Sequence, residues 1–286
     1  MKNVIEIKNL SKKYKSGFEL KNINLEIPLG MIIGLIGENG AGKTTIIKSI
    51  LNILKIDKGN IKIFNKNYKD EIVKEDIGVV LDNMFYPEIL TPNDIEISMK
   101  SIFKNFDSEL FNKYLDEFNV PKKNTIKTFS KGMRKKLEIA TALSHHPKLL
   151  ILDEPTSGLD PVVRSEILDI FLKFISDNEH TILLSTHITT DLEHIADKII
   201  FIDKGNIILN EDKDNIMDNY AILKCDIDSF SKIDKEDIIR YKKNKYNYDI
   251  LIKDKKKLSK KYKDYIIDNI TLDDLMLLVI KGEKIC

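Results

Sequence analysis

Short apolar runs alternate along the chain with longer amphipathic segments, a pattern typical of strands and helices in turn. Residues 31–36 are apolar on both faces, as expected for a strand in the middle of a parallel sheet. Residues 23–27 alternate apolar and polar side chains, so one face of that strand should meet water. The other expected strands lie at residues 4–7, 77–81, 149–152, 181–184 and 198–202.

Residues that favour helix caps stand immediately before several of the amphipathic segments. The expected caps are Thr91, Asp107, Ser130 and Asp160. Proline follows Thr91 and Asp160, at the one helical position that tolerates it well. Strands that alternate with helices predict an α/β fold with a parallel sheet. Residues 83–146 contain no clear strand, and we interpret them as a helical insertion.

The pattern changes near residue 219. Short strands are expected at 221–225 and 248–252, and a final amphipathic helix at 271–280. Residues 220–286 carry 16 Lys and Arg against 12 Asp and Glu, a net charge of +4, and a lysine run at 253–263 supplies most of it. A solvated charged face is favoured for this run over contact with anionic lipid headgroups. We therefore predict a main domain at 1–218 and a small α+β accessory domain at 219–286.

Composition excludes several classes of protein. The 286 residues include 46 Lys and Arg against 45 Asp and Glu, which argues against binding of nucleic acid by bulk positive charge but not against a local basic patch; no nucleic-acid partner is expected. The two cysteines, Cys225 and Cys286, lack metal-ligand spacing, and a reducing compartment is the default. No signal-peptide core is expected, and every apolar run is far shorter than the ~18 residues of a spanning helix.

Residues 37–44 read Gly-Glu-Asn-Gly-Ala-Gly-Lys-Thr and match the phosphate-loop pattern G-x-x-x-x-G-K-[ST]. They lie between a buried strand and an amphipathic helix, which is the context of a phosphate loop and disfavours an accidental glycine-rich turn. Glycines let several backbone N–H groups converge on one phosphate, and the helix adds its positive end. Lys43 should contact the β and γ phosphates, and the Thr44 hydroxyl should bind Mg²⁺.

Asp153 and Glu154 end another buried strand, at the edge of the sheet where ligands bind in α/β proteins. If the strands are parallel, this edge also carries Lys43. We then expect Asp153 to bind Mg²⁺, directly or through water, and Glu154 to polarise the water that attacks the γ-phosphate. The alternative is a solvated acidic pair that caps the turn before Pro155.

Further motifs follow in a recognisable order. Residues 129–133, Phe-Ser-Lys-Gly-Met, resemble the signature motif of ATP-binding cassette (ABC) ATPases, and residues 157–160 resemble the D-loop of that family. His187 resembles its switch histidine, although a structural cap is the alternative. Tyr14 resembles the aromatic residue that stacks on adenine, although it could simply be exposed. The resemblance extends over roughly residues 1 to 215.

The resemblance implies a P-loop NTPase with a mixed sheet core, an N-terminal antiparallel β-subdomain and a helical insertion. It also implies that two units pair head to tail, as a homodimer or with a related ATPase, and that each ATP lies between Lys43 of one unit and Ser130 and Gly132 of the other. The implied catalytic residues are Lys43, Glu154 and His187, and the implied Mg²⁺ ligands are Thr44, Asp82 and Asp153. The implied ATP contacts are Tyr14, Gly37, Glu38, Asn39, Gly40, Ala41, Gly42, Lys43, Thr44, Thr45, Ser130, Gly132 and Asp160.

The chain departs from the family pattern at three positions. Asp82 stands where the Q-loop glutamine is usual; it can still approach Mg²⁺ but cannot donate a hydrogen bond when ionised. Lys131 replaces the first glycine of the signature motif, and Met133 replaces its glutamine. Residues 84–87, Met-Phe-Tyr-Pro, could dock a helix of a membrane permease or pack inside the helical insertion, and both interpretations stay open.

Residues 160–164 and 184–188 resemble the branch of the family whose partners are export-type permeases. The expected function is that of a cytoplasmic ATP-hydrolysing subunit that dimerises on ATP and energises an exporter at the inner face of the cell membrane. The permease would be a separate integral-membrane chain. The alternative is a soluble ABC-type ATPase that acts on ribosomes or DNA. A nucleotide-regulated binding protein without turnover is disfavoured by the intact Glu154.

Overall fold

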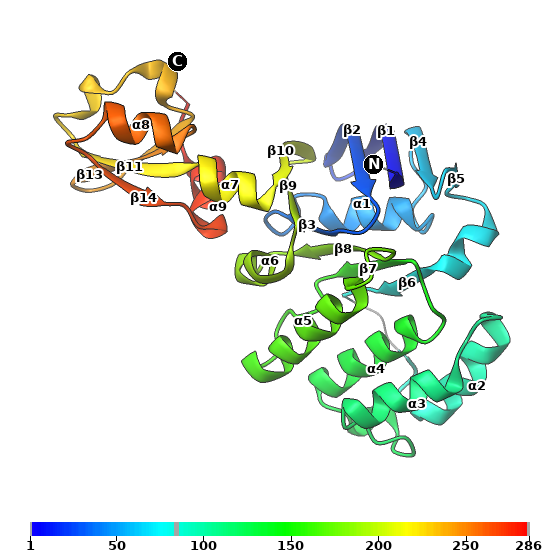
Figure 1. Ribbon diagram of the computed structural model, residues 1–286. Coiled ribbons are helices and arrows are strands. Elements are labelled where there is room, and N and C mark those ends of the chain that lie inside the picture. Colours follow the sequence, from blue (N-terminus) through cyan, green and yellow to red (C-terminus); the bar gives the residue numbers. More distant parts are fainter. Residues whose placement is uncertain (1, 83–85, 285–286) are drawn as a thin grey trace.

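The computed structural model describes residues 2–82 and 86–284. Its centre is a six-stranded sheet in the order β10-β9-β3-β8-β7-β6 (Figure 1). All neighbouring strands are parallel except β9 and β10, so the core sheet is mixed, as the resemblance implies. The strands are β3 (Ile32–Ile36), β6 (Ile77–Val80), β7 (Leu149–Asp153), β8 (Thr181–Thr186), β9 (Lys198–Asp203) and β10 (Asn206–Asp212).

The phosphate loop leads from the middle of this sheet into helix α1 (Lys43–Ile50). Every residue of β3 is buried, which confirms the expectation for a central strand. Above it, an antiparallel sheet runs in the order β2-β1-β4-β5, and α1 packs between the two sheets. Its strands are β1 (Asn3–Lys13), β2 (Glu19–Pro28), β4 (Lys58–Ile63) and β5 (Lys66–Asn67). In β2, Ile23, Leu25 and Ile27 are buried and their polar neighbours are exposed, as predicted.

Helices cover the other face of the central sheet. Helices α4 (Lys131–Leu143), α5 (Pro161–Ile175) and α6 (Thr189–Ile195) contact its strands, and α2 (Pro92–Ile102) and α3 (Ser108–Glu117) pack against α4. The side chains of Thr91, Asp107, Ser130 and Asp160 accept hydrogen bonds from first-turn N–H groups of α2, α3, α4 and α5, which confirms the predicted caps. Residues 86–146 contain helices and no strand, in agreement with a helical insertion.

A third sheet, in the order β12-β13-β11-β14, is built entirely from residues after Asn219. Its strands are β11 (Ala221–Asp226), β12 (Arg240–Lys243), β13 (Asn247–Ile252) and β14 (Ile266–Asn269), and its helices are α8 (Lys255–Lys261) and α9 (Leu272–Lys281). Helix α7 (Lys213–Asn219) connects it to β10. The sheet has an apolar cluster of its own, whereas the buried face of α9 joins the main core. Whether residues 219–286 form a separate domain stays a prediction.

Part of the lysine run at 253–263 is held in ion pairs. Lys253 lies 3.1 Å from Glu211, and Lys261 lies 2.5 Å from Asp234 and from Asp237. These ion pairs occupy two of the lysines with carboxylates of the chain itself. No helix within residues 2–82 and 86–284 is long and apolar enough to cross a bilayer.

Candidate nucleotide-binding site

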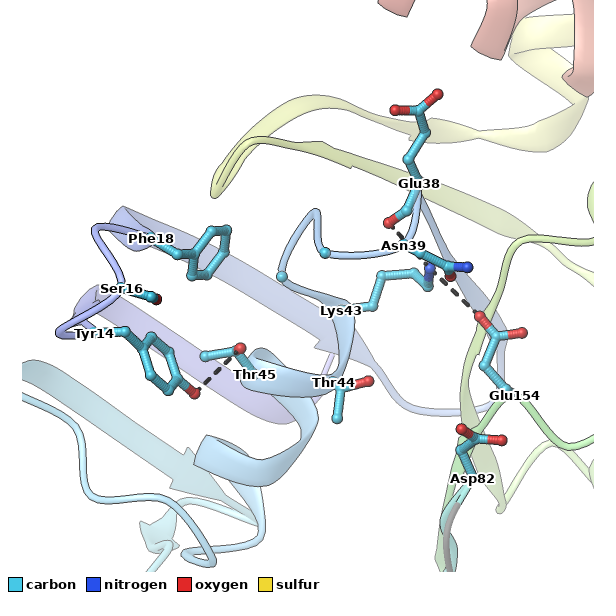
Figure 2. A pocket seen from close by; sticks show the side chains of 12 residues that line it. Tyr14, Ser16, Phe18, Glu38, Asn39, Lys43, Thr44, Thr45, Asp82 and Glu154 are labelled. Atoms are coloured by element: carbon cyan, nitrogen blue, oxygen red, sulfur yellow. Dashed lines mark hydrogen bonds and ion pairs between the residues drawn. The ribbon is translucent and has the colours of Figure 1, made fainter.

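A pocket of about 400 Å³ lies where the phosphate loop, the turn after β1 and the end of β7 meet (Figure 2). All but two of its lining residues are predicted site residues; Ser16 and Phe18 are the additions. The lining residues are Tyr14, Ser16, Phe18, Glu38, Asn39, Gly40, Gly42, Lys43, Thr44, Thr45, Asp82 and Glu154. Residues that are far apart in sequence therefore surround one space, as the parallel topology predicts.

Lys43 is only 5 % exposed, and carbonyl oxygens of its own loop hold its ammonium group. Nζ donates to the Gly37 carbonyl at 2.7 Å and to the Glu38 carbonyl at 3.4 Å. The loop needs glycine at residue 42, where φ is 119° and a Cβ would lie 2.8 Å from Leu20. The loop therefore presents a buried cation together with backbone N–H groups, which is the chemistry that binds phosphate.

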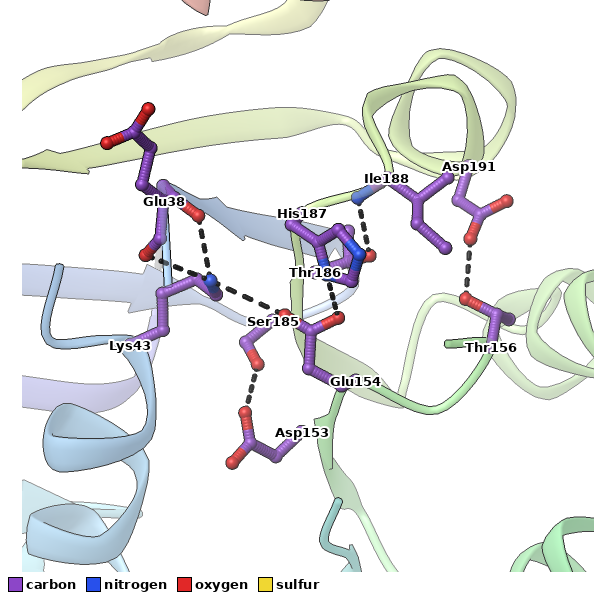
Figure 3. Close-up of polar contacts among 11 residues, drawn as sticks. Glu38, Lys43, Asp153, Glu154, Thr156, Ser185, Thr186, His187, Ile188 and Asp191 are labelled. Carbon is purple, nitrogen blue, oxygen red and sulfur yellow. Dashed lines mark hydrogen bonds and ion pairs between the residues drawn. The ribbon is translucent and has the colours of Figure 1, made fainter. Parts of the chain in front are cut away.

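Glu154 lies between Lys43 and His187 (Figure 3). Its Oε1 is 3.4 Å from Lys43 Nζ, and its Oε2 is 2.7 Å from His187 Nδ1. The residue has φ of 52°, the left-handed region that costs a non-glycine residue roughly 1–2 kcal/mol. Its N–H donates to the Ser185 carbonyl at 2.9 Å, which fixes this backbone in place. Strained residues of this kind cluster at functional sites, but Phe64 and Lys204 share this backbone, so the contacts with Lys43 and His187 are what distinguish Glu154.

Three predicted Mg²⁺ ligands surround the same region. Thr44 and Asp82 line the pocket from opposite sides, and Asp153 is 1 % exposed and accepts a hydrogen bond from Ser185 Oγ. Among the residues that the structure describes, no group of three or more His, Cys, Asp and Glu could hold a metal by itself. A hydroxyl and carboxylates still fit Mg²⁺, which proteins bind through one or two carboxylates together with substrate phosphates.

The turn between β1 and β2 places an aromatic pair at the pocket. The Tyr14 hydroxyl lies 3.4 Å from Thr45 Oγ1, and the Tyr14 and Phe18 ring centroids are 6.0 Å apart. The Tyr14 N–H donates to the Phe18 carbonyl at 2.8 Å, so a tight turn fixes both rings. Sequence reasoning identified Tyr14 but missed Phe18, whose only signal is its position at the other end of that turn.

Ser130, Gly132 and Asp160 lie outside this pocket, at the N-terminal ends of α4 and α5. The two helix ends are adjacent, since a Cβ on Gly132 would lie 3.2 Å from Val163. The Lys131 side chain extends toward the D-loop. Its Nζ lies so close to Gly158 that a Cβ added there would be only 2.6 Å away. The signature motif and the D-loop therefore share one surface, separate from the chain's own phosphate loop.

Comparison with known proteins identifies the family. The model of the ABC transporter family matches residues 20–157. The bacitracin transport ATP-binding protein BcrA of Enterococcus faecalis is 35 % identical over 213 residues, 73 % of this chain and 69 % of BcrA. The lantibiotic transport ATP-binding protein SrtF of Streptococcus pyogenes is 35 % identical over 213 residues, 74 % of this chain and 92 % of SrtF. The chain belongs to the ATP-binding subunits of ABC transporters.

Solved structures agree with this assignment. The ATP-binding subunit of an ABC transporter superposes with a TM-score of 0.67 at 26 % identity, over 74 % of this chain and 91 % of that one. A dimeric ATP-binding cassette in a post-hydrolysis state shares the fold, with a TM-score of 0.66 at 24 % identity, over 73 % and 98 % of the two chains. As an ABC ATPase, the chain binds and hydrolyses ATP to energise a membrane transporter, and these relatives lend no support to action on ribosomes or DNA.

Of the segment 84–87 in this ABC ATPase, the structure describes Tyr86 and Pro87. Tyr86 packs against the core of the helical insertion, and burial raises the pKa of its hydroxyl to about 12. For Tyr86 the structure thus favours core packing over a permease-docking ring. Met84 and Phe85, like Cys286, lie outside the described residues.

The helix that follows His187 is anchored by a polar network that the sequence pattern did not indicate. Asp191 of α6 is 1 % exposed and accepts a hydrogen bond from Thr156 Oγ1 at 2.6 Å (Figure 3). Arg164 of α5 pairs with the other oxygen of the same carboxylate. The network joins the segment after Glu154 to α6, so it cross-links the two segments that carry Glu154 and His187.

Proposed function

We propose that this chain is the ATPase of an ABC exporter, that it works as an ATP-induced dimer, and that a separate membrane permease holds it at the inner face of the membrane. The contacts of Glu154 with Lys43 and His187 beside the phosphate loop carry this proposal. Two relatives named for bacitracin and lantibiotic transport support the exporter class. The permease, rather than this chain, would then select the substrate.

Binding should begin with the phosphates of ATP meeting the loop N–H groups. Lys43 would exchange its contacts with the Gly37 and Glu38 carbonyls for the β and γ phosphates. Tyr14, which lines the pocket, would stack on the adenine. We propose that Thr44, Asp82 and Asp153 hold Mg²⁺, which supplies positive charge to the phosphates when it is bound.

Hydrolysis would use Glu154 as the base. Its carboxylate accepts the proton of the attacking water, and His187 holds Oε2 so that one orientation is favoured. The charge of Lys43 stabilises the negative charge on the phosphates. After hydrolysis the closed dimer would reopen, and the permease would follow this cycle.

Dimerisation can be tested at the surface that carries the signature motif. We expect Ser130→Glu to lower the affinity of ATP-induced dimers by about tenfold, because a carboxylate would then face the partner's γ-phosphate. The measurement is light scattering with ATP in a Glu154→Gln background, where hydrolysis does not consume the ligand. ATP affinity of the single chain should stay unchanged.

Thr91→Glu is the control, since Thr91 is a half-buried helix cap of the helical insertion that is not expected to meet nucleotide. Equal loss of dimers in both variants would contradict a head-to-tail dimer that places Ser130 at the partner's ATP.

The metal assignment predicts a specific defect for Asp82. If Asp82 helps to hold Mg²⁺, Asp82→Ala should raise the Mg²⁺ concentration for half-maximal ATPase by about tenfold. A Mg²⁺ titration at saturating ATP measures this shift. Asp76→Ala, at the other end of the same strand, provides the control. A Mg²⁺ profile like that of the unmodified chain would reject Asp82 as a ligand.

A further inference from the structure

Helix α6, which begins two residues after His187, is tied at both ends to the first turn of α9. Thr189 Oγ1 donates to Asp273 Oδ1 at 2.5 Å, and Thr189 is 2 % exposed. Glu193 Oε1 accepts the N–H of Leu272 at 2.6 Å, which satisfies one of the free N–H groups at the start of α9. The partners in these two bonds are 84 and 79 residues apart. The last helix of the chain therefore contacts the helix that follows the switch histidine.

Apolar packing reinforces these two bonds. Leu192 and Ile195 of α6 share a buried cluster with Leu272 and Leu275 of α9. On its other side α6 lies against β3, since a Cβ on Gly34 would lie 2.6 Å from Leu192 Cδ1. Helix α6 is thus held between the strand that leads into the phosphate loop and the accessory helix α9 (Figure 1).

Helix α6 needs such support from outside. It has only seven residues, and within the described parts of the chain no side chain caps its N-terminus at Ile188. A helix this short is not stable by itself, so tertiary contacts decide where it lies. Ile188 alone separates α6 from His187, and the Ile188 N–H donates to Thr186 Oγ1 at 2.9 Å. A displacement of α6 would consequently move the His187 ring relative to Glu154.

We propose that Thr189 and Asp273 are positioning residues for ATP hydrolysis, so that the accessory segment after residue 219 holds His187 in contact with Glu154. This inference rests on the proposed roles of Glu154 and His187. Neither Thr189 nor Asp273 lines the nucleotide pocket. Their contribution therefore belongs to the rate of the chemical step rather than to the affinity for ATP. The accessory segment becomes a control element of the ATPase, through which movement of α9 changes turnover.

The test compares substitutions that remove or keep the bond, in the chain of 286 residues. Thr189→Val keeps the shape but removes the donor, and Asp273→Leu removes the acceptor. We expect each to lower kcat about tenfold while KM for ATP stays within about twofold, because a small misplacement of a catalytic group costs rate rather than binding. Thr189→Ser and Asp273→Asn keep the donor and the acceptor oxygen, and should recover at least half of kcat.

Asp274→Ala is the matched control. Asp274 lies next to Asp273 and forms a capping box with Thr271, so its loss weakens the same turn of α9 without touching Thr189. Asp274→Ala is expected to lower the midpoint of thermal unfolding about as much as Thr189→Val does. The proposal requires that Asp274→Ala nevertheless keeps the kcat of the unmodified chain. If kcat tracks the midpoint in all variants, the bond is merely structural and the proposal is overturned.

Glu154→Gln and His187→Ala are measured in the same series. If both lose turnover while Thr189→Val keeps the kcat of the unmodified chain, this inference fails and the proposed function stands. If Glu154→Gln and His187→Ala keep their turnover, the proposed roles fail and the inference falls with them.

Discussion

Glu154→Gln should leave a protein that still binds ATP but turns it over about 10³-fold more slowly. Glutamine keeps the shape of glutamate and can still contact His187, but it cannot accept a proton from water. The loss should therefore appear in kcat and not in ATP affinity. Phosphate release measures the first quantity, and calorimetry with ATP measures the second.

The same variant should accumulate dimers in ATP, because the step that reopens them is removed. Glu166→Gln is a suitable control, since that carboxylate lies on the surface of α5 in an ion pair with Lys136. If Glu154→Gln turns over ATP at nearly the rate of the unmodified chain, Glu154 is not the base, and no other residue is assigned to that role.

Lys43→Ala should act at the earlier step and weaken ATP binding by about 10²- to 10⁴-fold. The ammonium is buried, so water cannot replace the charge-assisted hydrogen bonds that it would make to two phosphates, each worth about 1.5–3 kcal/mol. Calorimetry of ATP binding measures the loss directly. The two variants thus separate the roles: one loses turnover with binding intact, and the other loses binding.

Lys48→Ala provides the control for charge and helix content. It lies on the exposed side of the same helix, five residues further on. An unchanged dissociation constant for ATP in Lys43→Ala would show that this lysine does not reach the phosphates, and would leave only the backbone N–H groups to bind them.

The features predicted from the sequence are those that depend on neighbouring residues. The phosphate loop lies between a buried strand and a helix. The capping side chains of Thr91 and Asp107 accept hydrogen bonds from N–H groups only three residues further along the chain. Parallel topology then places Glu154 beside Lys43, since both follow strands of the same sheet. These predictions needed local chemistry and one rule of α/β architecture.

Other features depend on partners far away in the chain. Strand β4 has mostly exposed residues, so no apolar run in the sequence indicates it. It forms because its backbone pairs with β1. The pairing of Thr156 with Asp191, and of Thr189 with Asp273, joins residues 35 and 84 positions apart. Tyr86 was ambiguous because burial of an aromatic ring depends on the helices packed around it.

The left-handed backbone of Glu154 sets the demands of folding against those of catalysis. Glycine would relieve the roughly 1–2 kcal/mol of strain there at no steric cost, yet it would remove the proposed base. Selection for stability alone would therefore favour glycine over glutamate at this position. If Glu154 is the base, a design that optimises only the stability of this ATPase would favour an inactive protein here, so residue 154 should be held fixed.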